Sequence, residues 1–193
     1  MRKLILFSVG VAMLAAMPAS AKMIDGRYVA PGSEFSIAMQ ATADQLFKLD
    51  KESGNADLVV VDFQYARAQE HSGFAQRTVE WIKLAAPVDP AQFDAHASQT
   101  VSGYLEGRFA GVAFTTTDRR KQRNASGQLI YSFAATGTVN GTHSAWHGAL
   151  LFFDGGVALV SQLNTVATQP MLDADGITDA ELASWASTVR PGP

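Results

Sequence analysis

The sequence predicts an α+β fold in which an antiparallel β-sheet is covered by two amphipathic helices. Alternating polar and apolar residues predict strands, and Val59, Val61 and Phe63 fall on one face of the clearest of them. Asn140-Gly141 lies between two β-rich runs and is typical of a two-residue hairpin, because both turn positions require positive φ. Two further segments repeat apolar residues at helical spacing. Tight turns between successive strands favour antiparallel pairing.

Three strands are expected in the first half of the chain. A Pro31-Gly32 turn precedes the first, and Ser53-Gly54-Asn55 predicts a turn before the second. Residues 44–49 fit no single pattern and are left ambiguous. The three strands are expected at 33–39, 57–65 and 78–84.

The period then changes to that of a helix. Asp89 is a good N-cap residue, Pro90 suits the first helical position, and Gln92 follows two residues later. Gly107 supplies a stop. The spacing predicts a helix over 90–106 with an apolar stripe made of Phe93, Ala97, Val101, Tyr104 and Leu105.

A meander of four strands is expected after this helix. Its connections are the turn residues of 124–127, Asn140-Gly141 and 154–156. The four strands are expected at 109–117, 128–139, 142–153 and 157–163.

A second helix is expected at the C-terminal end. Thr178-Asp179-Ala180-Glu181 is a capping box, and Pro191 is expected to stop the helix. Its apolar stripe consists of Leu182, Trp185, Ala186 and Val189.

The first 21 residues have the features of a cleaved secretory signal. Arg2 and Lys3 precede a 14-residue apolar run, and Ala19 and Ala21 occupy the small positions of a cleavage site. A membrane-spanning helix needs about 20 apolar residues. We therefore expect cleavage before Lys22, a single soluble domain over 22–193, and a periplasmic or secreted bacterial protein that does not span a membrane.

Composition restricts the function classes that this domain can have. Cleavage leaves 13 basic and 18 acidic residues, a net charge of −5, which disfavours a general nucleic-acid binder. The chain has no cysteine, so it has no disulfide, thiolate metal site or cysteine nucleophile.

Three short motifs suggest chemistry but fit a structural role better. His143 and His147 lie about 13 Å apart if both are on one strand, which is too far for a shared metal ion. The acidic turn Asp173–Ile177 misses both end positions of a calcium loop, and Glu70-His71-Ser72 is an adjacent triplet rather than a folded triad. No catalytic residue, metal ligand or cofactor is therefore predicted.

The basic run Arg119-Arg120-Lys121-Gln122-Arg123 is the one departure from an acidic composition. It can bind an anionic envelope component or an acidic protein, or it can serve as a solvated edge that prevents strand aggregation. On a strand, Arg119, Lys121 and Arg123 share one side and Arg120 points to the other. All four are candidate binding residues. Arg119, Lys121 and Arg123 form the principal patch, and Arg120 is secondary.

Three segments together resemble the Mog1/PsbP/DcrB-like group. They are the strand Phe35-Ser36-Ile37 after a Tyr28-x-x-Pro31-Gly32 lead, the central helix, and the closing hairpin from Trp146 to Ser161. The resemblance implies a small α/β/α sandwich with a curved antiparallel sheet, often exported. It also implies an accessory or binding protein, because the group shares no catalytic residues.

The expected function is that of a non-catalytic periplasmic accessory or binding protein of the bacterial cell envelope. The alternative is a small hydrolase or lyase whose site is assembled from distant strands.

Overall fold

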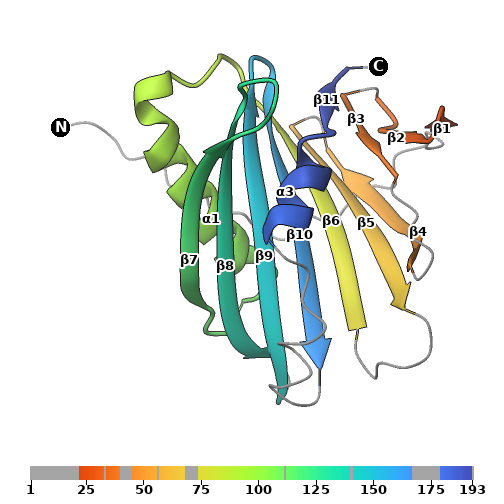
Figure 1. Ribbon diagram of the computed structural model, residues 1–193, viewed down its shortest axis with the longest axis vertical. Helices are drawn as coiled ribbons and strands as arrows, with labels where there is room; N and C mark the ends of the chain where they lie inside the picture. The colour runs from red at the N-terminus through yellow and green to blue at the C-terminus, as the bar shows by residue number, and fades with distance from the viewer. Residues whose placement is uncertain are drawn as a thin grey trace.

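Two antiparallel sheets form most of the structure, a computed structural model that describes residues 22–32, 34–39, 45–55, 57–67, 74–110, 112–139, 141–166 and 179–192. The large sheet consists of β4 (Gln45–Gly54), β5 (Leu58–Arg67), β6 (Phe74–Lys83), β7 (Thr115–Arg123), β8 (Leu129–Val139), β9 (Thr142–Phe153) and β10 (Gly156–Val166). The small sheet consists of β1 (Lys22–Ile24), β2 (Arg27–Val29), β3 (Phe35–Ala38) and β11 (Arg190–Pro191). The strand orders are β4-β5-β6-β10-β9-β8-β7 and β1-β2-β3-β11 (Figure 1).

Helices lie on opposite faces of the large sheet. A 3-10 turn, η1 (Pro90–Gln92), leads into α1 (Phe93–Arg108), and the Asp89 carboxylate accepts a hydrogen bond from the Ala91 backbone N–H at 2.9 Å. The second helix, α3, spans Asp179–Ala186. Figure 1 shows α3 in front of the large sheet and α1 behind it.

One face of the large sheet packs against α3 and the small sheet. Val61, Phe63 and Val79 on this face are fully buried, as are Phe35 of β3 and Trp185 of α3. The indole N–H of Trp185 donates to the Ala38 carbonyl at 2.8 Å, which ties α3 to the end of β3. The opposite face packs against α1 in a second cluster that includes Ala97, Val101, Tyr131, Phe133, Leu150 and Leu159.

The predicted α+β class and the antiparallel meander are confirmed. Strands occupy 35–38, 58–67, 129–139, 142–153 and 156–166, close to the expected ranges. Gly141 has a φ of 79°, as the predicted hairpin turn requires. The helical segment begins at Pro90, as the Asp89 cap predicts, but its first three residues form η1 and α1 starts at Phe93. The helix ends at Arg108, two residues beyond the expected end.

The prediction of a strand over 109–117 is wrong. The Phe109 backbone N–H still bonds to the Leu105 carbonyl at the helix end, and the Phe109 and Phe114 rings lie 4.8 Å apart in the α1-side core. Both rings are partly buried against this core, and β7 begins at Thr115. The basic run therefore lies inside β7.

Other boundaries also differ from the expectations. Residues 45–49, within the segment that the sequence left ambiguous, belong to β4, which continues to Gly54. Asn55 then makes the turn, because its side-chain oxygen accepts from the backbone N–H groups of Asp57 and Leu58. Strand β6 begins at Phe74, earlier than the expected position 78.

The C-terminal helix is shorter than its stripe predicts. It ends at Ala186, and the Thr188 hydroxyl donates back to the Trp185 carbonyl at 2.7 Å. Val189 is buried beyond the helix, and Pro191 lies in β11, opposite Phe35. Thr178 of the expected capping box lies outside the described residues. Within the described ranges, no helix has the length and apolarity needed to cross a membrane.

We expect Trp185→Ala to destabilise the fold severely. The substitution empties a fully buried site and leaves the Ala38 carbonyl without its donor. Truncation of a core aromatic residue costs about 3–5 kcal/mol, which corresponds to a melting temperature lower by roughly 10 °C for a chain of this size. Thermal unfolding followed by circular dichroism measures this change. Ser184→Ala, an exposed change on the same helix, is the control; equal melting temperatures for the two variants would contradict the docking of α3.

Candidate functional site

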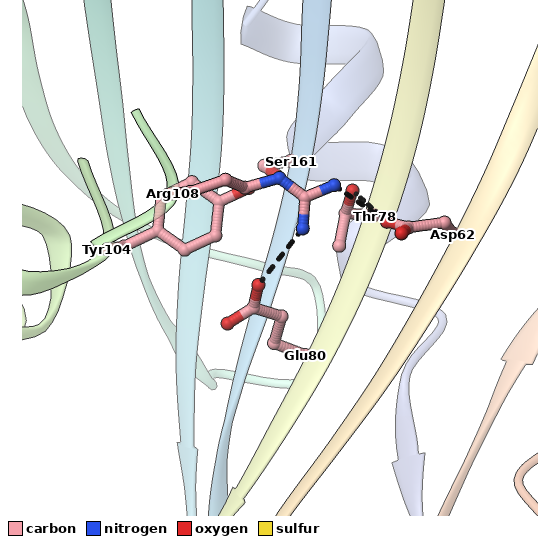
Figure 2. Close-up of polar contacts among 6 residues, drawn as sticks. All are labelled: Asp62, Thr78, Glu80, Tyr104, Arg108 and Ser161. Carbon is pink, nitrogen blue, oxygen red and sulfur yellow. Dashed lines mark hydrogen bonds and ion pairs between the residues drawn. The ribbon is translucent and has the colours of Figure 1, made fainter. Parts of the chain in front are cut away.

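A polar cluster lies on the α1 side of the large sheet, where α1 ends. We call it the Arg108 cluster; Figure 2 shows its members, which are Asp62 of β5, Thr78 and Glu80 of β6, Ser161 of β10, and Tyr104 and Arg108 of α1. The strand register accounts for the assembly, because Thr78 is the cross-strand partner of both Asp62 and Ser161. Tyr104 and Arg108 are four residues apart and so lie on one side of the helix.

Arg108 connects the helix to two strands. Its Nη2 donates to Asp62 Oδ1 at 2.9 Å, and its Nη1 lies 3.8 Å from Glu80 Oε1. The Thr78 hydroxyl donates to the same Asp62 oxygen at 2.8 Å. The Asp62 and Glu80 side chains are each only 13 % exposed, so both charges sit in a partly desolvated setting. Through one carboxylate on each strand, the guanidinium holds the end of α1 over β5 and β6.

Glu80 is the group whose ionisation depends most on this setting. Burial raises its pKa from 4.5 to about 7, Arg108 opposes the shift, and the nearby Asp62 carboxylate adds to it. The pKa of Arg108 is itself raised, since Tyr104, Asp62 and Glu80 outweigh the effect of its burial. Glu80 can therefore gain or lose a proton near neutral pH, whereas Arg108 stays charged.

The Ser161 hydroxyl contacts a neutral phenol rather than a base. The Tyr104 hydroxyl lies 3.4 Å from Ser161 Oγ, and burial, followed by the field of Glu80, raises the Tyr104 pKa well above its usual value. A neutral phenol does not accept a proton from a serine at neutral pH. Nucleophilic catalysis by a serine requires an adjacent base, so the contact shown here favours a positioning role for Ser161.

The basic run forms most of β7, at one end of the large sheet (Figure 1). Each of the four cationic residues is exposed. Arg119, Lys121 and Arg123 lie opposite Phe133, Tyr131 and Leu129, which belong to the α1-side core. Arg120 lies opposite Ser132. The predicted division, with three cations on one side and Arg120 on the other, is confirmed.

Two of these cations are paired with acids of the chain itself. Lys121 Nζ lies 2.7 Å from Asp94 Oδ1, which also accepts from the Tyr131 hydroxyl at 2.5 Å. These hydrogen bonds lower the pKa of Asp94, and its bond to Lys121 raises the lysine pKa. The pair therefore stays charged across the neutral range. On the other side of the strand, Arg120 Nε lies 2.7 Å from Asp118 Oδ2.

Arg119 and Arg123 differ from their neighbours in this respect. Arg123 Nη1 donates to the Gly127 carbonyl at 2.6 Å, an uncharged acceptor. Within the described ranges, no acidic side chain lies within ion-pair distance of either guanidinium group. The patch is thus two uncompensated guanidinium groups with a neutralised ion pair between them. Sequence spacing could not reveal this, because Asp94 approaches from α1, 27 residues earlier in the chain.

Other sequence candidates do not join either feature. His143 and His147 both lie on β9, four residues apart. The Glu70–Ser72 and Asp173–Ile177 motifs lie outside the described residues. Across the part of the chain that is described, no three His, Asp or Glu side chains are grouped closely enough to hold a metal ion.

The Arg108 cluster could not be predicted from the sequence. Asp62 and Glu80 fill the polar positions of alternating strands, which is the normal pattern for a solvent-facing side. Arg108 follows the glycine that was expected to end the helix. Only the helix end, which brings Arg108 over both strands, distinguishes these residues from ordinary surface charges.

Comparison with known proteins identifies the fold. No model of a known protein family matches the sequence, and no curated protein matches it. Among solved structures, the yeast (Saccharomyces cerevisiae) Ran-binding protein Mog1p matches over 90% of this chain and 96% of its own, with a TM-score of 0.51 and 11% identity. The chain shares the Mog1p fold. The predicted resemblance is confirmed at the level of this Mog1p-like fold. The cyanobacterial PsbP of Synechocystis also matches, over 95% of each chain, with a TM-score of 0.46 and 10% identity.

The raised pKa of Glu80 makes stability depend on pH. Between pH 4.5 and about 7 the folded chain holds the Glu80 proton more strongly than the unfolded chain does. The stabilisation is therefore complete below pH 4.5 and is lost as pH rises through 7. We expect the wild type to lose roughly 3 kcal/mol more unfolding free energy than Glu80→Gln between pH 4.5 and pH 8.

Urea unfolding at a series of pH values measures this difference. Glu106→Gln, which removes an exposed carboxylate near the end of α1, is the control and should follow the wild type. Parallel curves for the wild type and Glu80→Gln would show that Glu80 is not coupled to folding in this way.

Proposed function

We propose that the chain is an exported accessory or binding protein of the bacterial cell envelope, without catalytic activity, and that it captures an anionic partner through β7. The observation that carries this proposal is the pair Arg119 and Arg123, which are exposed and uncompensated by the acids of the described residues. Lys121 between them is neutralised by Asp94. The binding residues are therefore two arginines rather than three cations.

Charge distribution supports an anionic partner. The exported form has a net charge of −5, so a positive edge is a local exception that attracts anions while the remaining surface repels them. Exposed charges act over about 8 Å at physiological ionic strength. Binding should therefore be confined to this edge and should weaken as salt is added.

The fold supports a protein partner by analogy. Mog1p is described as a Ran-binding protein, so the shared fold is compatible with binding another protein. Fold analogy does not specify the ligand. The class of ligand is therefore inferred from the charges on β7.

Export follows from the N-terminal signal pattern. We expect the full chain, expressed in a Gram-negative host, to be recovered from the periplasmic fraction with an intact mass that begins at Lys22, because Ala19 and Ala21 satisfy the signal peptidase. Recovery of all 193 residues in the membrane pellet would contradict the proposal.

Replacement of both arginines should remove capture without unfolding the protein. We expect Arg119→Ser/Arg123→Ser to retain wild-type stability within about 0.5 kcal/mol, as exposed substitutions usually do. The variant should lose most of its low-salt binding to two probes, poly-glutamate and phosphatidylglycerol vesicles, whichever of them the wild type binds. Co-sedimentation and fluorescence anisotropy measure the binding, and urea unfolding measures the stability.

The matched control is Lys22→Ser/Arg190→Ser. It removes the same charge from exposed positions on the small sheet and should bind as the wild type does. Equal losses for the two double variants would show a general charge effect and would overturn the assignment to β7.

The Arg108 cluster favours a second candidate, a small hydrolase or lyase. Its residues come from three strands and a helix, and the Glu80 pKa of about 7 suits general acid–base chemistry. A substrate screen decides between the candidates. Turnover that is lost in Glu80→Gln and retained in Arg119→Ser/Arg123→Ser would establish the enzyme and overturn the non-catalytic proposal.

A further inference from the structure

Strand β7 combines an open sheet edge with charge. It ends the seven-stranded sheet and pairs on one side with β8. Its other side has no strand partner within the described ranges (Figure 1). An edge strand offers N–H and C=O groups to any extended chain that approaches it. The edge can therefore recognise a backbone as well as a charge.

The regular part of β7 coincides with the basic run. A register shift lies between Thr116 and Asp118, and from Asp118 to Arg123 each residue faces one residue of β8 without interruption. A bulge protects an edge by twisting it away from a partner, but here it precedes the arginines. Six consecutive residues of regular strand thus follow the shift. Within them, the Arg119 backbone N–H donates to Asp118 Oδ1 at 2.7 Å, so an added strand that used this amide would replace a side-chain hydrogen bond.

We infer that β7 accepts an acidic extended segment of a partner protein as an eighth strand of the large sheet. This inference rests on the proposed function and specifies its ligand. In strand addition, main-chain hydrogen bonds supply affinity and alternate side chains supply specificity. A second copy of this chain does not fit the edge, since it would place the arginines of one β7 against those of the other.

The positions of the charges define a motif for the added strand. Arg119 and Arg123 lie on the same side of β7, about 13 Å apart at ~3.3 Å per residue. Residues i and i+4 of the added strand face them directly, so both should be acidic. Position i+2 faces Lys121, which Asp94 already neutralises, and an acid there would meet the Asp94 carboxylate. The expected pattern is acid-x-neutral-x-acid.

Synthetic peptides test the spacing. The probe is a nine-residue peptide of serine, threonine and valine with glutamates at positions 3 and 7; the control has the same composition with glutamates at positions 3 and 6. An odd spacing places the acids on opposite sides of a strand. By fluorescence anisotropy, the first peptide should bind several-fold more tightly to the wild type and show no such preference for Arg119→Ser/Arg123→Ser.

Backbone methylation tests the pairing itself. The first peptide is prepared with N-methyl groups at positions 3, 5 and 7, or at positions 4 and 6. Only one set of amides faces β7, so strand addition predicts that one methylated peptide loses at least about tenfold in affinity while the other binds nearly as the parent does. Equal binding by both peptides would overturn strand addition.

The failure of this inference is distinguishable from failure of the proposed function. One outcome is binding that is independent of glutamate spacing and of N-methylation and yet is lost in Arg119→Ser/Arg123→Ser. That result would support anion capture at β7 and would overturn the added strand. Binding of phosphatidylglycerol vesicles in place of either peptide has the same meaning. Peptide binding that the double variant does not reduce would overturn both.

Discussion

The antiparallel pairing of β6 with β10 joins the two halves of the chain, and both the core and the candidate sites depend on it. Ten residue pairs, from Phe74 opposite Thr165 to Lys83 opposite Gly156, connect the N-terminal strands to the C-terminal meander. A buried hydrogen bond of 2.6 Å from Arg77 to Gln162 lies within this junction. A shift of one residue would exchange the two faces of β6 against β10. The register therefore determines which residues meet α1 and which meet α3.

Each face of the resulting sheet carries an apolar cluster that a helix covers. Polar binding or catalytic residues are therefore restricted to the margins of these clusters and to the sheet edges. On the α1 side, covering ends at Arg108, and the polar residues of β5 and β6 gather around that guanidinium group. On the other side, α3 and the small sheet share the task, with Trp185 packed edge-on to Phe63. The edge at β7 remains exposed, and the basic run lies there. Binding through an edge requires no opening of either core.

Local pattern predicted the elements that depend on local chemistry. The alternation of Val59, Val61 and Phe63, the Asp89 cap and the Asn140-Gly141 turn each act within a few residues, and the structure agrees with them. Patterns that depend on distant contacts failed. Phe109 and Phe114 were expected in a strand, but their rings pack on each other beside the helix end. Val189 was expected in the last helix but is buried beyond it. The short strand β11 forms by pairing with β3, which lies far from it in the sequence. The sites follow the same division: strand alternation predicted the side that Arg119 and Arg123 occupy, but the neutralisation of Lys121 by Asp94 and the capture of Glu80 by Arg108 are long-range contacts.

Amide hydrogen exchange of the free protein, resolved by residue with NMR, tests the open edge most directly. Successive residues of a strand direct their N–H groups to opposite sides. Between Asp118 and Arg123, we therefore expect every second amide to be protected by β8 and the amides between them to exchange much faster. The residues of β9 and β10 that have a paired strand on each side should be protected without this alternation. Uniform protection along β7 would contradict this expectation, because the outer edge would then already be occupied in the free protein.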